Sequence, residues 1–164
     1  MTASRLDSLT HCVAPQFFRT ELADAVSKAR REKAPISLVW LDVDECAVAN
    51  QDHGVELVNQ AIARVGLTLR VLVGEKGTVG RVQGAAFAVL LPGLTREAAL
   101  DFGQVLRSAT AHLEHTGEGK SFELKLSGAV VQAMPNELPL NLLEAAEILS
   151  VRAKQAGRDT LLLR

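Results

Sequence analysis

The chain lacks several features that mark specialised classes of protein. Its two cysteines, Cys12 and Cys46, are too few for a disulfide framework, and its formal net charge is only −1, which gives no general attraction to nucleic acid or to an anionic membrane. No apolar run approaches the ~20 residues that span a bilayer, and the amino terminus lacks a signal-peptide pattern. We therefore expect no nucleic-acid partner, no membrane contact and a cytoplasmic location.

What the sequence does contain is the composition of a folded domain. Hydrophobic residues make up 48% of the 164 residues and charged residues 23%, which is enough for a sizeable core and is unlike a disordered tail. Neither an internal repeat nor an interdomain linker is visible. We therefore expect residues 1–164 to form one domain.

Helical periodicity alternates with short apolar runs along the chain. The spacing predicts helices over 16–33 and 55–73, with a strand buried on both faces over 36–43 between them. A β-hairpin is predicted from strands 78–82 and 86–91, and a hairpin excludes an all-parallel sheet. The sequence therefore predicts the α+β class, with helices around a mostly antiparallel central sheet. The remaining predictions are a helix over 95–113 capped by Thr95, a charged loop over 115–120, a strand over 122–132, a helix over 140–155 and a strand over 160–163.

The predicted hairpin is the most informative stretch, because two apolar runs flank a small-residue turn. It resembles the signature of the diguanylate cyclase (GGDEF) family, in which two glycines and two acidic residues precede a phenylalanine on a β-hairpin. The matching residues here are Gln83, Gly84, Ala85, Ala86 and Phe87. One glycine and both acidic residues of the signature are therefore replaced.

Four further motifs, in the family's order and spacing, extend the resemblance over nearly the whole chain. Agreement at five places is much harder to meet by accident than a single match. The chain is therefore identified as a degenerate member of the GGDEF family, and the resemblance implies that family's palm-like cyclase fold. The four motifs are Asp7 to Cys12 with Phe18, Leu41 to Cys46 with Asn50 and Gly54, Leu126 to Ala129, and Ala146-Glu147 with Ala153 to Asp159.

The resemblance also implies a metal-dependent joining of two nucleoside triphosphates. Most of the metal-binding and phosphate-binding side chains that this reaction needs are missing. Asp42 matches the family's metal-binding strand carboxylate, but Ala85 and Ala86 supply no carboxylate from the hairpin. One carboxylate holds Mg²⁺ weakly unless a nucleotide provides the other ligands. The family's loop lysine falls on Ala47. We therefore expect no catalytic residue, no cofactor and no enzyme activity, and Asp42 alone is also explained as a strand-end carboxylate that caps the next turn.

A remnant of the family's nucleotide site is retained in part. Asn50 matches the residue that contacts the base, whereas Asn59 stands where the family has an aspartate for guanine. Lys154 and Arg158 match the phosphate-binding cations of the last helix. Each also has a plainer explanation, Asn50 as a turn residue, Asn59 as a solvated helix position, and the two cations as partners of a helix dipole.

The family's inhibitory site for cyclic di-GMP is an Arg-x-x-Asp motif, and its two positions fall on Gly74 and Gly77. Binding this dinucleotide tightly needs guanidinium groups directed at guanine and phosphate. Arg70 and Arg81 are the only arginines near this segment. We expect Arg70 to face solvent and Arg81 to pack beside the hairpin.

The pattern of loss favours a catalytically inactive GGDEF-like domain that acts as a protein-interaction or regulatory module. Packing motifs survive while the metal, phosphate and inhibitory sites are lost together. We expect a protein partner in a bacterial signalling or polarity complex. The alternative is a non-catalytic sensor that binds GTP or another nucleotide weakly. A cyclic di-GMP effector and an active diguanylate cyclase are less favoured.

We predict that cyclic di-GMP binds with a dissociation constant of about 100 μM or weaker, because unspecific charge contacts reach only that level. Titration calorimetry measures it directly. Low-micromolar affinity that is abolished by Arg70→Ala or Arg81→Ala would contradict the prediction.

Overall fold

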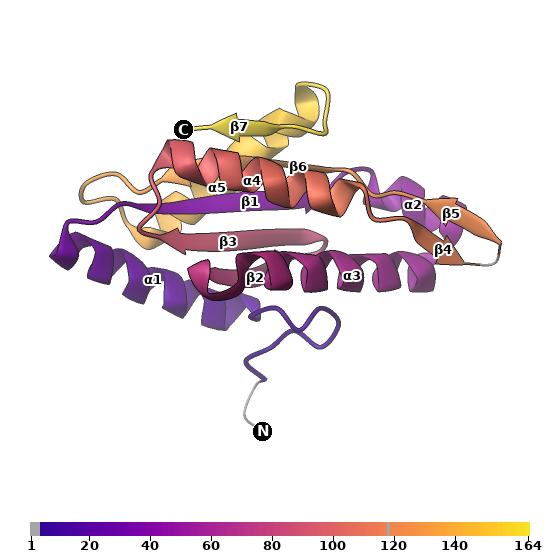
Figure 1. Cartoon of the computed structure of the whole chain (residues 1–164), viewed down its shortest axis with the longest axis horizontal. Helices are drawn as coiled ribbons and strands as arrows, with labels where there is room; N and C mark the ends of the chain where they lie inside the picture. The colour runs from indigo at the N-terminus through magenta and orange to yellow at the C-terminus, as the bar shows by residue number, and fades with distance from the viewer. Residues whose placement is uncertain (1–3, 118) are drawn as a thin grey trace.

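The computed structural model describes residues 4–117 and 119–164. Within these residues the centre is a five-stranded sheet in the order β2-β3-β1-β6-β7, with helices on both faces (Figure 1). Neighbouring strands are antiparallel except for the parallel pair β6 and β7. The predicted α+β class is confirmed. The strands are β1 (Ile36–Val43), β2 (Thr78–Gln83), β3 (Ala86–Pro92), β6 (Leu126–Gln132) and β7 (Leu161–Leu163).

Strand β1 is buried on both faces, as predicted, because its alternate side chains belong to two separate cores. Leu38 and Trp40 pack in the core that holds α1 (Pro15–Glu32) and α5 (Pro139–Gln155). Val39 and Leu41 pack in the core that holds α3 (Val55–Val73) and α4 (Arg96–Ala111). Successive side chains of a strand point to opposite faces, so one strand joins both helical layers.

Several boundaries agree with the sequence predictions. Strand β1 and helix α3 have the predicted bounds, and the residue after α3, Gly74, has a positive φ of 51° that ends the helix. Thr95 caps α4, since its side chain accepts a hydrogen bond from the Ala98 amide at 3.4 Å. A short 3-10 helix, η1 (Gly74–Lys76), links α3 to β2.

Three short elements differ from the prediction. Helix α2 (Cys46–His53) fills the segment between β1 and α3, for which the sequence predicts no element, and it has no fully buried residue that would mark a periodic apolar face. Strands β4 (His115–Gly117) and β5 (Lys120–Phe122) form a small hairpin in place of the predicted charged loop over 115–120, of which residue 118 lies outside the described residues. The predicted strand 122–132 is interrupted, because β5 ends at Phe122 and β6 begins at Leu126.

One helical stretch, Val55–Lys76, is long and apolar enough by composition to cross a membrane, although the sequence has no uninterrupted apolar run of that length. Such a composition is also that of a core helix. Here Val58, Ile62, Val65 and Leu69 are buried in the core beneath the sheet. Packing therefore explains part of the apolar character of α3, while other apolar side chains of this stretch remain exposed.

Gly128 on β6 allows β6 to lie close to β1. A Cβ atom built on it would lie 1.7 Å from the carbonyl oxygen of Trp40 on β1. Backbone atoms of a paired strand cannot withdraw without breaking the ladder. The close contact explains why glycine occupies this buried position.

We predict that Gly128→Ala lowers the free energy of unfolding by about 3 kcal/mol or more, because the added methyl overlaps backbone. Urea unfolding gives the value. The matched control is Gly93→Asn, where φ is 82° and nothing lies within 4 Å of an added Cβ, so asparagine should cost no more than about 1 kcal/mol. Equal losses in the two variants would contradict this role of Gly128.

Candidate functional site: the remnant at the β2-β3 hairpin

The hairpin turn is braced by the chain itself. Gly84 has a φ of 46°, and its carbonyl oxygen accepts a hydrogen bond from Arg81 Nε at 2.8 Å. The pairing register shifts between Arg81 and Gln83. Arg81 also contacts Asp7 Oδ1 at 3.1 Å, so it packs beside the hairpin, as expected. Phe87, directly after the turn, is completely buried.

Asp42 on β1 and Lys154 on α5 are brought together from distant parts of the chain. Lys154 Nζ lies 2.9 Å from Asp42 Oδ2 and donates a hydrogen bond to the Val43 carbonyl oxygen at 3.1 Å. Both side chains are about three-quarters buried, with 29% and 26% of their surfaces exposed. The retained carboxylate and the retained lysine therefore neutralise each other.

The donor set around Asp42 does not fit a divalent metal. Ala86 is opposite Asp42 in the sheet and is 1% exposed, so it turns a methyl group into the core. The Ala85 carbonyl oxygen already accepts a hydrogen bond from the Val43 amide at 3.2 Å. Mg²⁺ needs several hard oxygen ligands, and the side chains here offer one carboxylate that is already paired with an ammonium group.

A second contact ties the hairpin to α5. Gln83 Nε2 donates a hydrogen bond to Glu147 Oε1 at 2.8 Å. Glu147 belongs to a motif that the sequence identified, but its contact with the hairpin was not predicted. The side chain that replaces the family's first glycine is therefore held against the last helix.

The other predicted residues have different surroundings. Asn50 on α2 and Asn59 on α3 are half-buried on consecutive helices that meet at Gly54. Arg158 follows α5 in a left-handed conformation with φ 63°, is exposed, and lines a pocket whose walls include neither Asp42 nor Lys154. The two cations of the last helix thus lie in different surroundings.

The expectation for Arg70 was only half right. Arg70 is exposed, but it also lines a hollow of about 320 Å³ together with Arg5 and His11. Gly74 and Gly77, at the positions of the family's inhibitory motif, line the same hollow. Arg70 Nη1 lies 3.5 Å from the Thr10 carbonyl oxygen, so the Arg70 side chain is partly held against the amino-terminal loop.

Asp44 is the polar residue that the sequence interpretation overlooked. It is only 6% exposed, and its Oδ2 accepts hydrogen bonds from Ser127 Oγ at 2.8 Å and from the Asp159 amide at 3.1 Å. These bonds join the end of β1 to β6 and to the turn before β7. The signals available were its place directly after a buried strand and the alternation with Asp42.

The thiols and histidines add no reactive group to this region. Burial raises the pKa of the Cys46 thiol, and the Asp42 carboxylate raises it further, which disfavours the nucleophilic thiolate. His115 begins the segment that the sequence predicts as a charged loop, but its side chain does not face solvent. His112 is exposed, whereas His115 is 2% exposed and packs against the Phe122 ring with centroids 5.4 Å apart.

Comparison with known proteins decides the family. Residues 4–160 match the model of a family described as diguanylate cyclase, GGDEF domain. The chain belongs to the GGDEF domain family. The family expected from the five motifs is confirmed, and the relatives that the chain matches are bacterial proteins.

The relatives are distant in sequence and close in fold. Diguanylate cyclase DgcP of Pseudomonas aeruginosa is 28% identical over 140 residues, which cover 85% of this chain and 21% of that protein. The GGDEF domain of DgcB from Caulobacter crescentus, solved with c-di-GMP, superposes with a TM-score of 0.92 at 20% identity over 98% of this chain and 93% of that one. Diguanylate cyclase SiaD of P. aeruginosa, solved with its activator SiaC, superposes with a TM-score of 0.92 at 21% identity, and the match covers 97% of this chain and 61% of that one. The chain spans between a fifth and a half of the length of the first curated relatives that it matches.

The Asp7 carboxylate anchors the amino-terminal loop to this GGDEF hairpin. It accepts hydrogen bonds from the Thr10 amide and hydroxyl, both at 2.8 Å, and contacts Arg81 at 3.1 Å. Burial by itself would raise the pKa of Asp7, but the bonds from Thr10 and Arg81 outweigh it and hold the pKa below the usual 3.8. The folded state therefore favours the ionised form.

We predict that Asp7→Asn lowers the free energy of unfolding by about 1 kcal/mol at pH 7. Because folding lowers the pKa, the stabilisation is fully present above the unfolded value of about 3.8 and is lost as pH falls through the lower folded value. Urea unfolding at a series of pH values measures this, with exposed Asp24→Asn as the control. A difference between Asp7→Asn and the parent that persists unchanged to about pH 2 would contradict it.

Proposed function

We propose that this domain is a catalytically inactive regulatory module that binds a protein partner in bacterial signalling. The GGDEF family and the cyclase fold are those of bacterial signalling domains. The single observation that carries the proposal is the ion pair between Asp42 and Lys154 at 2.9 Å, next to a hairpin without carboxylates.

Electrostatics supports the loss of catalysis. A divalent cation bound to Asp42 would lie within a few ångströms of the Lys154 ammonium group, and like charges at that distance repel strongly in a partly buried site. Neither alanine of the hairpin can compensate with a negative charge. Phosphoryl transfer depends on metal ions to neutralise developing charge, so this arrangement opposes the reaction.

Two observations support a protein partner. Leu140, Ile148 and Val151 on α5 are at least half exposed. They are spaced by eight and by three residues, which places them on one face of the helix. Apolar side chains grouped on a surface favour contact with another protein. A similar fold, that of SiaD, was solved in complex with an activator protein.

A non-catalytic nucleotide sensor is the second candidate. Asn50 and Asn59 are half-buried on adjacent helices, and amide side chains can both donate to and accept from a base edge. Calorimetry with GTP, with and without Mg²⁺, tests it, and no heat at about 1 mM nucleotide would remove it.

We predict that the domain forms no cyclic di-GMP from GTP and Mg²⁺ above a no-protein control, as measured by chromatography of the products. The double variant Ala85→Glu/Ala86→Glu should not regain full activity, since Ala86 is 1% exposed and Lys154 still pairs with Asp42. Ala85→Glu alone, at a half-exposed position, is the better-folded comparison.

Product made by the parent chain and lost in Asp42→Ala would overturn the inactive assignment. The partner is tested separately by affinity capture. A captured protein should be lost when Ile148 and Val151 are both replaced by aspartate, with circular dichroism as the check on folding. Retention by this variant would remove the α5 face from the proposal.

A further inference from the structure

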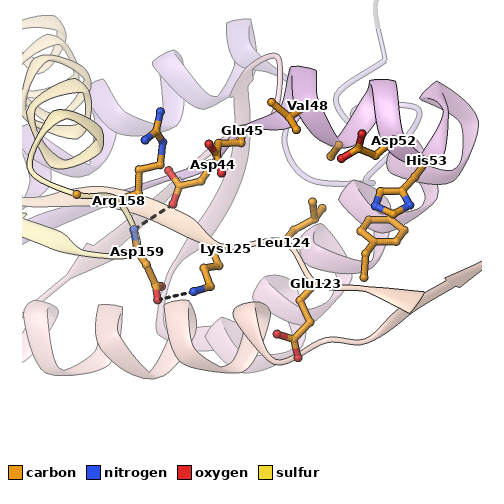
Figure 2. A pocket seen from close by; sticks show the side chains of 13 residues that line it. Asp44, Glu45, Val48, Asp52, His53, Glu123, Leu124, Lys125, Arg158 and Asp159 are labelled. Atoms are coloured by element: carbon orange, nitrogen blue, oxygen red, sulfur yellow. Dashed lines mark hydrogen bonds and ion pairs between the residues drawn. The ribbon is translucent and has the colours of Figure 1, made fainter. Parts of the chain in front are cut away.

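A pocket of about 480 Å³ lies between α2, the segment that precedes β6 and the turn after α5 (Figure 2). Asp42, Ala85 and Lys154 are not among its lining residues, so it is separate from the hairpin. Arg158 is the one residue of the predicted nucleotide remnant that lines it. Five acidic and two basic side chains line it. The acidic residues are Asp44, Glu45, Asp52, Glu123 and Asp159.

Asp44 gives the pocket an unsatisfied buried acceptor. Its Oδ2 has two donors, from Ser127 and Asp159, but its Oδ1 is buried without a hydrogen-bond partner among the described residues. An unpaired buried oxygen of a carboxylate is costly, and such an atom in a native protein calls for a donor. A cationic group that entered from the pocket would supply one.

The negative groups lie at two ends with apolar surface between them. Figure 2 shows Asp44 and Glu45 together at one end and Asp52 at the other, with Val48 and Leu124 between. Glu45 and Asp52 are seven residues apart along α2, which corresponds to about 10 Å at the rise of an α-helix. The Glu123 carboxylate points away from the other acidic groups.

The basic residues do not cancel this charge. Lys125 Nζ lies 3.8 Å from Asp159 Oδ2, and Arg107 forms an ion pair with the same carboxylate, so these two cations are directed at Asp159. Arg158 is exposed. The carboxyl end of the 17-residue helix α5 also leads into this turn, and the carboxyl end of a helix favours a cation.

We propose that this pocket binds an aliphatic chain that carries ammonium groups, supplied either by a free polyamine or by lysine side chains of a partner. One ammonium group would lie by Asp44 and Glu45, the methylene groups would cover Val48 and Leu124, and a second ammonium would reach Asp52. Ammonium groups have three donors each and suit carboxylate oxygens. The inference holds whether or not the domain turns over GTP.

The pattern disfavours other ligand classes. Anionic nucleotides would be repelled by the carboxylates. Among the residues that the structure describes, no three His, Cys, Asp or Glu side chains are grouped closely enough to hold a metal ion. An extended organic cation matches both the separation of the acidic ends and the apolar surface between them.

The test is calorimetry of spermidine against the whole 164-residue chain. We expect a dissociation constant tighter than about 1 mM, weakened at least about fivefold by Glu45→Gln and by Asp52→Asn. Asp24→Asn removes an exposed carboxylate from α1, outside the pocket, and should leave the affinity unchanged. Asp44 is left in place because it also joins β1 to β6.

No heat at about 10 mM spermidine, or equal weakening by all three variants, would overturn the proposal. Complete suppression by Mg²⁺ at matched ionic strength would overturn it too, because screening is then equal and a compact divalent cation would be shown to take the same carboxylates without an aliphatic chain. A dilysine peptide that binds more tightly than spermidine, with the same loss in Glu45→Gln and Asp52→Asn, would support the shared chemistry and assign it to a partner's side chains.

Discussion

The double burial of β1 is the constraint on which the rest of the structure depends. Its apolar side chains at even positions, up to Trp40, enter the core under α1 and α5, and its apolar side chains at odd positions, from Val39 on, enter the core under α3 and α4. Both neighbours must approach closely to complete the ladder, and Gly128 of β6 allows this approach at Trp40. A strand enclosed in this way has no free surface of its own, so polar chemistry is confined to its ends.

The carboxyl end of β1 places two carboxylates where the burial of the strand gives way to solvent. Asp42 is paired with Lys154 from α5, and Asp44 is held by Ser127 and the Asp159 amide. Partly buried carboxylates need opposite charges or donors, and in each case α5 or the turn after it contributes one. The last helix thus has a structural role at the site that the family uses for nucleotides.

Conservation of the fold beside loss of the signature has a physical reason. Packing depends on the volume and pattern of apolar side chains, and many sequences satisfy the same pattern. The GGDEF domain of DgcB accordingly superposes with a TM-score of 0.92 although only 20% of the aligned residues are identical. A metal site depends on individual oxygen atoms, and Ala85 and Ala86 carry methyl groups at the positions where the resemblance implies carboxylates. The hairpin keeps its shape because Arg81, Gln83 and the Gly84 backbone hold it.

The sequence by itself determined the α+β class and the bounds of β1 and α3, because these follow from periodicity and residue type. It also determined the family, through the resemblance of five motifs, and with it the replacement of the signature acids. It missed α2 and the β4-β5 hairpin, since eight-residue and three-residue elements are too short for a clear period. It also predicted a charged loop that begins at His115, which is instead buried against Phe122. Only the tertiary structure decided that Lys154 pairs with Asp42 while Arg158 faces another pocket. Residues 42 and 154 are far apart in the chain, and no local pattern records which side chain neutralises which.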